Sequence, residues 1–432
     1  MNAEGALPSR LLPVLYFGLA HLSLTTAFAA MVMDPAGVAG FFYQPRTIGI
    51  VHLVTLGWIS ASILGALYVI GPLALRMPLP AGGVDYAAFA LVAIGTSGMA
   101  GHFFIARYAG AAWSGGLALA GILIVALRVL PRLVAAPVQE AVKLHAGLAF
   151  GNVLLAGLMG IALAVHKEHP FLPGPPLGYV FAHLHVAALG WAGMMVLGVG
   201  YRMMPMILPA AMPPGRSLHA SAVLLEAGIL GLVAGFLLGD RLLPPSALLA
   251  AAGFAAFLLQ VRWMLANRRR RPPWLRLPDY GLLHVLASIL YVVLGAVLGV
   301  TLSILPQSDR SLRAAAAYGV AGLLGFLGQM VLGMLSRVLP MLAVCHANRG
   351  ATCDAPPVTP REMGIPGFPA AIFVLWSAGV PLLAAGMFLQ AAPAAGAGGA
   401  VMFAASVLQA FQAADVLRHA FRRPRGGGPA LQ

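Results

Sequence analysis

The stretch HLHVAALGWAGMMVLGVGYRMMP, residues 183–205, decides the fold of this chain, because it is apolar over the length of a membrane helix yet begins with two histidines. Imidazoles in lipid are costly and rare, and they usually mark a cofactor or an ion path. A helix turns by about 100° per residue, so the rings of His183 and His185 point about 200° apart. One membrane helix could then hold a metal on each of two sides and place two metal centres side by side.

The composition of the whole chain is that of a membrane protein. It has 432 residues, of which 60% are hydrophobic and only 9% are charged, unlike a soluble globular protein. The first apolar stretch is too long for a cleavable signal peptide and lacks its charged start. We predict an all-α polytopic membrane protein, because apolar stretches long enough to cross a bilayer recur along the chain. The twelve predicted spans are 11–32, 46–74, 84–106, 111–130, 139–165, 178–205, 217–239, 244–265, 280–304, 313–343, 367–390 and 394–419.

The net charge of +14 would suit a nucleic-acid partner, but its distribution indicates membrane topology instead. With the N-terminus inside, twenty of the 26 Lys and Arg residues fall in inner segments and six in outer ones, a strong positive-inside bias. We predict a bacterial-type inner membrane protein with both termini cytoplasmic and no nucleic-acid partner. Cys345 and Cys353, near the inner side, should be reduced thiols. The inner basic residues are Arg10, Arg76, Arg128, Arg132, Lys143, Arg202, Arg216, Arg262, Arg268, Arg269, Arg270, Arg271, Arg276, Arg337, Arg349, Arg361, Arg418, Arg422, Arg423 and Arg425.

The segment after His185 recurs twice more in the chain. The three copies follow one another at near-equal intervals, each close to a third of the chain, and each copy falls on an even-numbered span. We therefore predict three pseudo-symmetric repeats of four helices, at 11–130, 139–265 and 280–419. The matched sets are Gly57, Gly65, Tyr68 and Pro72; Gly190, Gly198, Tyr201 and Pro205; and Gly325, Gly333, Ser336 and Pro340.

The repeat also relates the histidines. Two histidines from facing helices at matched depth can hold one haem iron by both axial positions. We expect His52 and His185 to be that pair, because the repeat puts them at equal depth in the outer half of the membrane. His183, on the opposite face of its helix, is expected to ligate a second haem or a copper. At these two positions the three copies have Ile50 and His52, His183 and His185, and Tyr318 and Val320.

Further ionisable side chains within the spans are weaker candidates. His102 and His21 could join the cluster. His145 and His284 could form an inner copper site or a proton path, with His219 nearby, or could simply meet water and headgroups. Glu226 lies well inside the seventh span, where an isolated charge is expensive. It could belong to a proton path, or it could be a neutral acid bonded to a neighbouring helix.

His183-Leu184-His185 with Ala188-Leu189-Gly190-Trp191 resembles the paired-histidine helix of haem–copper oxidase catalytic subunits, especially cbb-type oxidases and nitric oxide reductases. The resemblance implies that His183 binds a high-spin haem and that His185 and His52 bind a low-spin haem. Here the pair is on the sixth span instead of the tenth, and no adjacent His-His pair supplies copper ligands. In size and layout the chain also resembles the NnrS-like group, which are haem- and copper-containing membrane proteins linked to nitric oxide handling.

We therefore expect a haem-binding membrane redox protein that handles nitric oxide or oxygen. Its expected cofactors are one or two haems, with copper as a further expectation. Its expected partners are the lipid bilayer, a diatomic gas, and an electron-donor protein or cytochrome c-type subunit. The sequence also fits a proton- or metal-coupled transporter, since repeats and polar groups at the midplane occur in transporters, or a haem-handling protein without catalysis.

Overall fold

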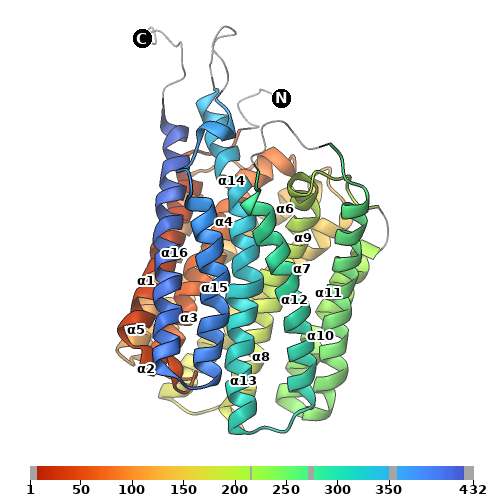
Figure 1. Cartoon of the computed structure of the whole chain (residues 1–432). Helices are drawn as coiled ribbons and strands as arrows, with labels where there is room; N and C mark the ends of the chain where they lie inside the picture. Colours follow the sequence, from red (N-terminus) through yellow and green to blue (C-terminus); the bar gives the residue numbers. More distant parts are fainter. Residues whose placement is uncertain (1–6, 215–216, 271–276, 350–357, 423–432) are drawn as a thin grey trace.

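The structure is a computed structural model that describes residues 7–214, 217–270, 277–349 and 358–422. The predicted all-α membrane fold is confirmed: twelve helical segments are long and apolar enough to cross a membrane, and the described residues contain no β-strand. α1 begins and α16 ends at the same end of the bundle, which we call the terminal end (Figure 1). Some residues of the sequence analysis lie outside the described ranges, namely Arg216, Arg271, Arg276, Cys353, Arg423 and Arg425.

The spans are of two kinds, simple and composite. The simple spans are α1 (Leu11–Met33), α5 (Gly83–Phe104), α6 (Tyr108–Ala135), α7 (Glu140–Glu168), α10 (Ser217–Leu238), α11 (Leu243–Ala266), α12 (Tyr280–Ile304), α15 (Phe368–Phe388) and α16 (Ala392–Arg418). The second span joins α3 (Pro45–His52), η2 (Leu53–Ser60) and α4 (Ala61–Ala74). The sixth joins α8 (Pro176–His185), η3 (Val186–Gly193) and α9 (Met194–Ile207). The tenth joins α13 (Asp309–Val320), η5 (Ala321–Gly328) and α14 (Gln329–Ala347). Short helices are α2 (Pro35–Ala39), η4 (Asp240–Leu242), η6 (Pro360–Glu362) and η7 (His419–Phe421).

The middle part of each composite span is a π-helix, a wider turn that is rare and often found at functional sites. The π-helices begin at Leu53, Val186 and Ala321, with the same spacings as the sequence repeat. Two of them start directly after a histidine, His52 and His185. The three π-helices also contact one another. The threefold repeat stays a prediction, and these matched starts support it.

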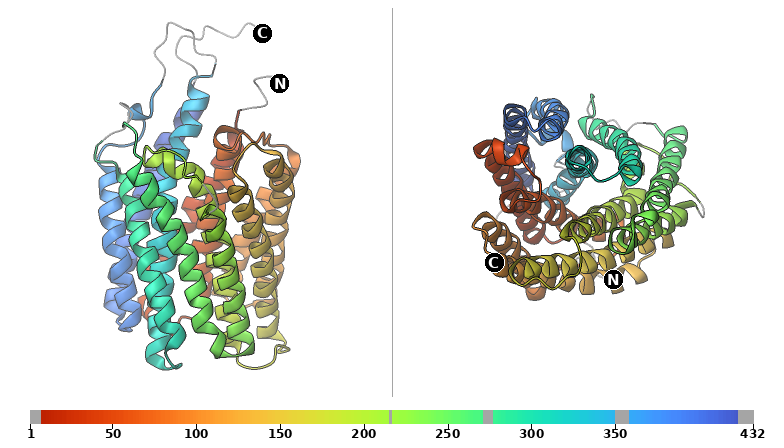
Figure 2. Two further views of the ribbon diagram at one scale, coloured as in Figure 1. Left: turned by 90° about the vertical axis from the view of Figure 1, so that its right-hand side faces the viewer. Right: turned by 90° about the horizontal axis from the view of Figure 1, so that it is seen from below.

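The three composite spans form the centre of the bundle. The buried share of their apolar windows is 83, 61 and 72%, against 17 to 56% for the other spans. Seen from below in Figure 2, the chain runs around the bundle in sequence order, from red through green to blue. α1 packs against α16 and closes the ring. Side chains on the central spans therefore face protein or enclosed space more than lipid.

Tryptophans interlock the central spans where they meet. The indole Nε1 of Trp191 donates a hydrogen bond to Ser60 Oγ at 2.8 Å, which joins the sixth span to the second. Trp58, which is the counterpart of Trp191 in the predicted repeat, packs on the tenth span, where a side chain on Gly328 would come within 3.3 Å of its ring. The buried Trp58 Nε1, unlike that of Trp191, has no hydrogen-bond partner among the described residues.

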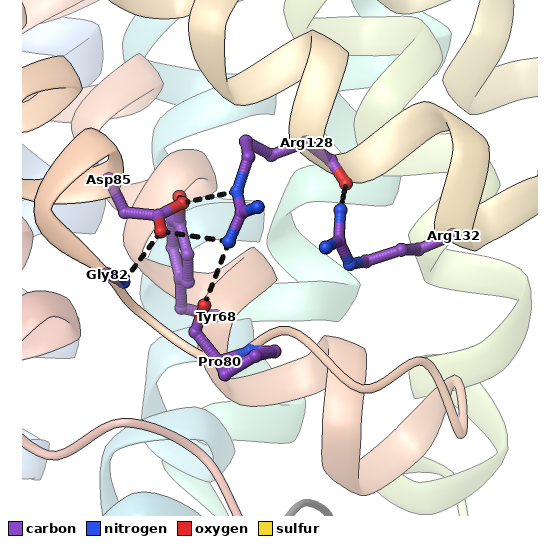
Figure 3. Close-up of polar contacts among 6 residues, drawn as sticks. All are labelled: Tyr68, Pro80, Gly82, Asp85, Arg128 and Arg132. Atoms are coloured by element: carbon purple, nitrogen blue, oxygen red, sulfur yellow. Dashed lines mark hydrogen bonds and ion pairs between the residues drawn. The ribbon is translucent and has the colours of Figure 1, made fainter.

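A buried ion pair joins α5 to α6 at the terminal end. The fully buried carboxylate of Asp85 accepts hydrogen bonds from Tyr68 Oη at 2.7 Å, from the Gly82 amide at 2.8 Å and from two nitrogens of Arg128 at 3.1 and 3.2 Å (Figure 3). Arg337 of α14 makes a second, largely buried ion pair with Asp279, the residue directly before α12. The Arg337 guanidinium is thus largely buried and paired within the protein.

Candidate haem site

A cavity of about 1180 Å³ lies at the end of the bundle remote from the termini. Pockets for one small ligand are usually roughly 300–1000 Å³, so this cavity is larger than a single small molecule needs. The walls come mainly from the central spans together with α5, α6, α7 and α10. The three histidines that the sequence singled out, His52, His183 and His185, all line it.

Backbone carbonyls orient the rings of all three histidines. A carbonyl oxygen can only accept, so each Nδ1 carries the proton and each Nε2 keeps its lone pair. No described residue hydrogen-bonds to any of these Nε2 atoms. Metal-ligating histidines commonly use this arrangement, in which one nitrogen is bonded to protein and the other faces the metal. The bonds join His52 Nδ1 to Ile48 O at 2.8 Å, His185 Nδ1 to Phe181 O at 2.7 Å and His183 Nδ1 to Ala156 O at 2.9 Å.

The structure pairs the histidines differently from the sequence prediction. The ring of His52 lies beside that of His183, with centroids 6.4 Å apart and planes inclined by 26°. His185 instead faces Tyr318, with centroids 6.2 Å apart and the same inclination. The ring contacts favour His183 as the partner of His52, and haem ligation by His52 and His185 together stays a prediction. Three helices that pack around one axis each turn a different face to each of their two neighbours, so residues at equal depth on two of them need not face each other.

The His52–His183 pair fits two axial ligands of one iron. Metal–imidazole bonds are about 2 Å long, so two imidazoles on one metal have ring centres about 6 Å apart. The observed 6.4 Å matches this spacing. Phe103 stacks on His52 at 5.3 Å, and the chain has glycine at Gly160, where a Cβ would approach His183 Cε1 to 3.0 Å. Apolar packing around both rings suits a haem.

Two basic residues, Lys167 and Arg241, line the cavity at the end of the bundle remote from the termini. Lys167 Nζ lies 4.0 Å from the ring centroid of Tyr43 and 5.1 Å from that of Tyr108. Burial raises the pKa of Tyr43, and Tyr108 raises it further, so the cation lies over a neutral ring, which favours it. This positive rim is suited to the carboxylate groups that a haem carries on one edge.

The weaker histidine candidates lie elsewhere. His102 Nδ1 is 3.2 Å from Ser114 Oγ, and His21 Nδ1 is 2.7 Å from Phe17 O; neither residue lines the cavity. His145 lies between Ala141 O and Ser221 Oγ, at 2.7 and 2.9 Å, and His284 is bonded to Gln329. Within the described ranges no group of three or more His, Cys, Asp or Glu side chains could hold a metal ion. The structure therefore does not assemble an inner copper site from them.

Glu226 is half-buried on α10 and accepts a hydrogen bond from Asn152 Nδ2 of α7 at 2.8 Å. It does not line the cavity. This contact matches the alternative of an acid bonded to a neighbouring helix. Its role in a proton path stays a prediction.

Sequence reasoning missed several parts of the site. Tyr318 was noted only as a position without histidine, although it occupies the register position of His183. The flanking rings Phe103 and Phe236 are separated by the repeat interval, so the repeat could have found them. The Ala156 carbonyl gives no signal in the sequence, because any residue supplies one.

Comparison of the chain with protein-family models and with curated proteins finds no match. The geometry of the cavity and of its three histidines is therefore the basis for a functional assignment.

Proposed function

We propose that this protein is a haem-binding redox protein of the membrane, with His52 and His183 as the two axial ligands of one haem. The observation that carries the proposal is the pair of imidazoles with centroids 6.4 Å apart in a membrane-embedded cavity. Both rings have Nδ1 bonded to a carbonyl and Nε2 without a protein partner among the described residues. A haem with both axial positions filled by protein suits electron transfer better than ligand binding.

The chain's own residues have separate tasks in this proposal. His52 and His183 would hold the iron through their Nε2 atoms. Phe103 and the apolar walls exclude water, which tunes the redox potential. Lys167 and Arg241 meet the carboxylates at the rim. The bound haem supplies one-electron transfer, and an electron-donor protein or cytochrome c-type subunit would meet the protein at this end of the bundle.

Handling of nitric oxide or oxygen is the wider role that we propose, supported by the resemblance to haem–copper oxidase subunits and the NnrS-like group. We propose haem as the metal cofactor in preference to copper, because the described residues offer a two-histidine clamp and no cluster of three ligands.

Haem content tests the proposal. Protein purified from haem-replete cells should contain haem with the spectrum of bis-imidazole iron, and His52→Ala and His183→Ala should each abolish that spectrum. His102→Ala is the matched control, because His102 is a histidine of α5 that does not line the cavity. A colourless wild-type protein, or bis-imidazole haem retained in both variants, would contradict the proposal. A haem-free protein that took up protons or metal ions into vesicles would favour the transporter.

A further inference from the structure

The last turn of α7 holds the loop that leads into α8. His166 Nδ1 accepts hydrogen bonds from the backbone amides of Phe171 at 2.9 Å and Leu172 at 3.0 Å, and the Phe171 ring lies edge-on to the imidazole at 5.7 Å. A ring nitrogen that accepts hydrogen bonds carries no proton, so His166 is neutral in this arrangement and has its proton on Nε2. The cavity histidines are bonded in the opposite sense, since each donates from Nδ1 to a backbone carbonyl.

The loop has few other hydrogen bonds to keep it in place. Its sequence is HPFLPGP, residues 169–175, in which three of the seven residues are prolines, and proline has no amide hydrogen. Besides the two bonds to His166, Tyr179 Oη of α8 donates to Pro173 O at 3.0 Å. No further side-chain hydrogen bond to the loop occurs within the part of the chain that the structure describes. The position of the loop therefore depends strongly on His166.

The loop borders the mouth of the cavity. Pro175, its last residue, and Leu177, in the first turn of α8, both line the cavity. One residue later α8 is held against α10, because Gly178 is so close to that helix that a Cβ on it would be 2.6 Å from Phe236 O. A movement of the loop would therefore displace the mouth of the cavity, while the part of α8 that carries His183 stays packed in place.

The charged side chains next to His166 are engaged with other partners. Glu168 accepts hydrogen bonds from the first two amides of α6 at 3.0 and 3.1 Å, and Lys167 lies over the rings of Tyr43 and Tyr108. Among the described residues, no acidic or basic side chain of α6, α7, α8 or η4 forms an ion pair with His166. The two bonds to the loop are therefore controlled by the protonation of His166 and not by a neighbouring carboxylate.

We propose that His166 is a proton-sensitive clasp that closes the outer mouth of the cavity. Histidine is the side chain whose charge ordinarily changes between about pH 5 and 8. Protonation puts a hydrogen on Nδ1, which removes the acceptor of both bonds and turns that hydrogen toward two amide hydrogens. The clasp is therefore closed at neutral and alkaline pH, and it opens as the pH falls. The predicted topology places this loop on the outer side, where the acidity of the surroundings acts on it directly. The inference concerns access to the cavity and does not depend on haem as its occupant.

Labelling of a buried cysteine behind the mouth tests the clasp in the purified full-length protein. In a background without Cys345 and Cys353, Val180→Cys places a thiol at a position of α8 that lines the cavity and is only 6% exposed. Its rate of labelling by an impermeant maleimide is divided by that of the exposed Arg310→Cys at the same pH, which corrects for thiol ionisation. With His166 intact, this ratio should rise about fivefold or more between about pH 7.5 and 5.5, the range in which histidine titrates. Leu177→Cys, nearer the loop, is a second reporter.

Two substitutions of His166 should have opposite effects on this ratio. His166→Asn keeps an acceptor oxygen near the Nδ1 position that does not titrate, so the ratio should stay low at both pH values. His166→Ala has no acceptor, so the ratio should be high at both. His169→Ala is the matched control, because the side chain of this neighbouring histidine has no hydrogen bond to a described residue, and it should behave like the protein with His166 intact. A ratio independent of pH with His166 intact, or acid opening retained in His166→Asn, would overturn the clasp.

Discussion

Two kinds of polar residue inside the bundle differ in how many of their polar atoms have a protein partner. The Asp85 carboxylate receives four hydrogen bonds and needs nothing more. His52, His183 and His185 each have one nitrogen bonded to a carbonyl and one directed to no described protein atom. His21 also has an Nε2 without a protein partner, so the position of the other three histidines on the cavity wall, and not the open nitrogen alone, supports their proposed role, whereas the Asp85 cluster stabilises the fold.

Removing the partner of Asp85 should destabilise the protein strongly. Arg128→Ala leaves a buried carboxylate without its cation, which costs about 3–5 kcal/mol. Tyr68→Phe removes one hydrogen bond to a charged group and should cost about 1.5–3 kcal/mol. Thermal unfolding in detergent measures both. Arg132→Ala is the control, since Arg132 only donates to the Arg128 carbonyl at 2.7 Å; an Arg128→Ala protein as stable as this control would contradict the structural role.

The histidines of the cavity are positioned by helices next to the central spans as well as by the central spans themselves. α7 contributes the Ala156 carbonyl that orients His183 and the bare surface of Gly160 on which its ring lies. α5 and α10 contribute Phe103 and Phe236, which flank the other two histidines. The positions of the three histidines therefore depend on close contacts with α5, α7 and α10, which one added side chain can disturb.

A side chain at Gly160 should displace His183. The added Cβ would lie 3.0 Å from His183 Cε1, so Gly160→Val pushes the ring away from His52. We expect this variant to lose bis-imidazole haem while still folding, because overpacking costs about 1–3 kcal/mol. Gly151→Val on the same helix is the control, since a Cβ there meets nothing within 4 Å. Equal haem spectra in the two variants would show that α7 does not position the ligand.

The twelve apolar helices of the whole molecule could be predicted from sequence, but the ring contacts of its histidines could not. Twelve spans follow from length and hydropathy, because the bilayer fixes both. The intervals of the sequence repeat even match the starts of the π-helices. Sequence reasoning paired His52 with His185, because the register of the repeat predicts how deep a residue lies in the membrane. It does not predict which neighbouring helix the side chain faces. The partner His183 follows only once the central helices are placed around one another.

Membrane orientation is a property of the whole chain and can be tested by labelling. We predict that the loop between α7 and α8 faces outward and that the loop after α11 faces the cytoplasm, because basic residues concentrate on the terminal side. In a background without Cys345 and Cys353, an impermeant maleimide should label His169→Cys in intact cells and label Asn267→Cys only after lysis. The reverse pattern would show that the chain is inverted.

Ligation of one iron by His52 and His183 is tested most directly by near-infrared magnetic circular dichroism of the oxidised protein, because this measurement identifies axial ligands. The wild type should show a bis-imidazole signature. His183→Met should convert that signature to imidazole–thioether and raise the reduction potential, since methionine ligation raises it. A His183→Met protein that retained the full bis-imidazole signature at an unchanged potential would contradict the claim.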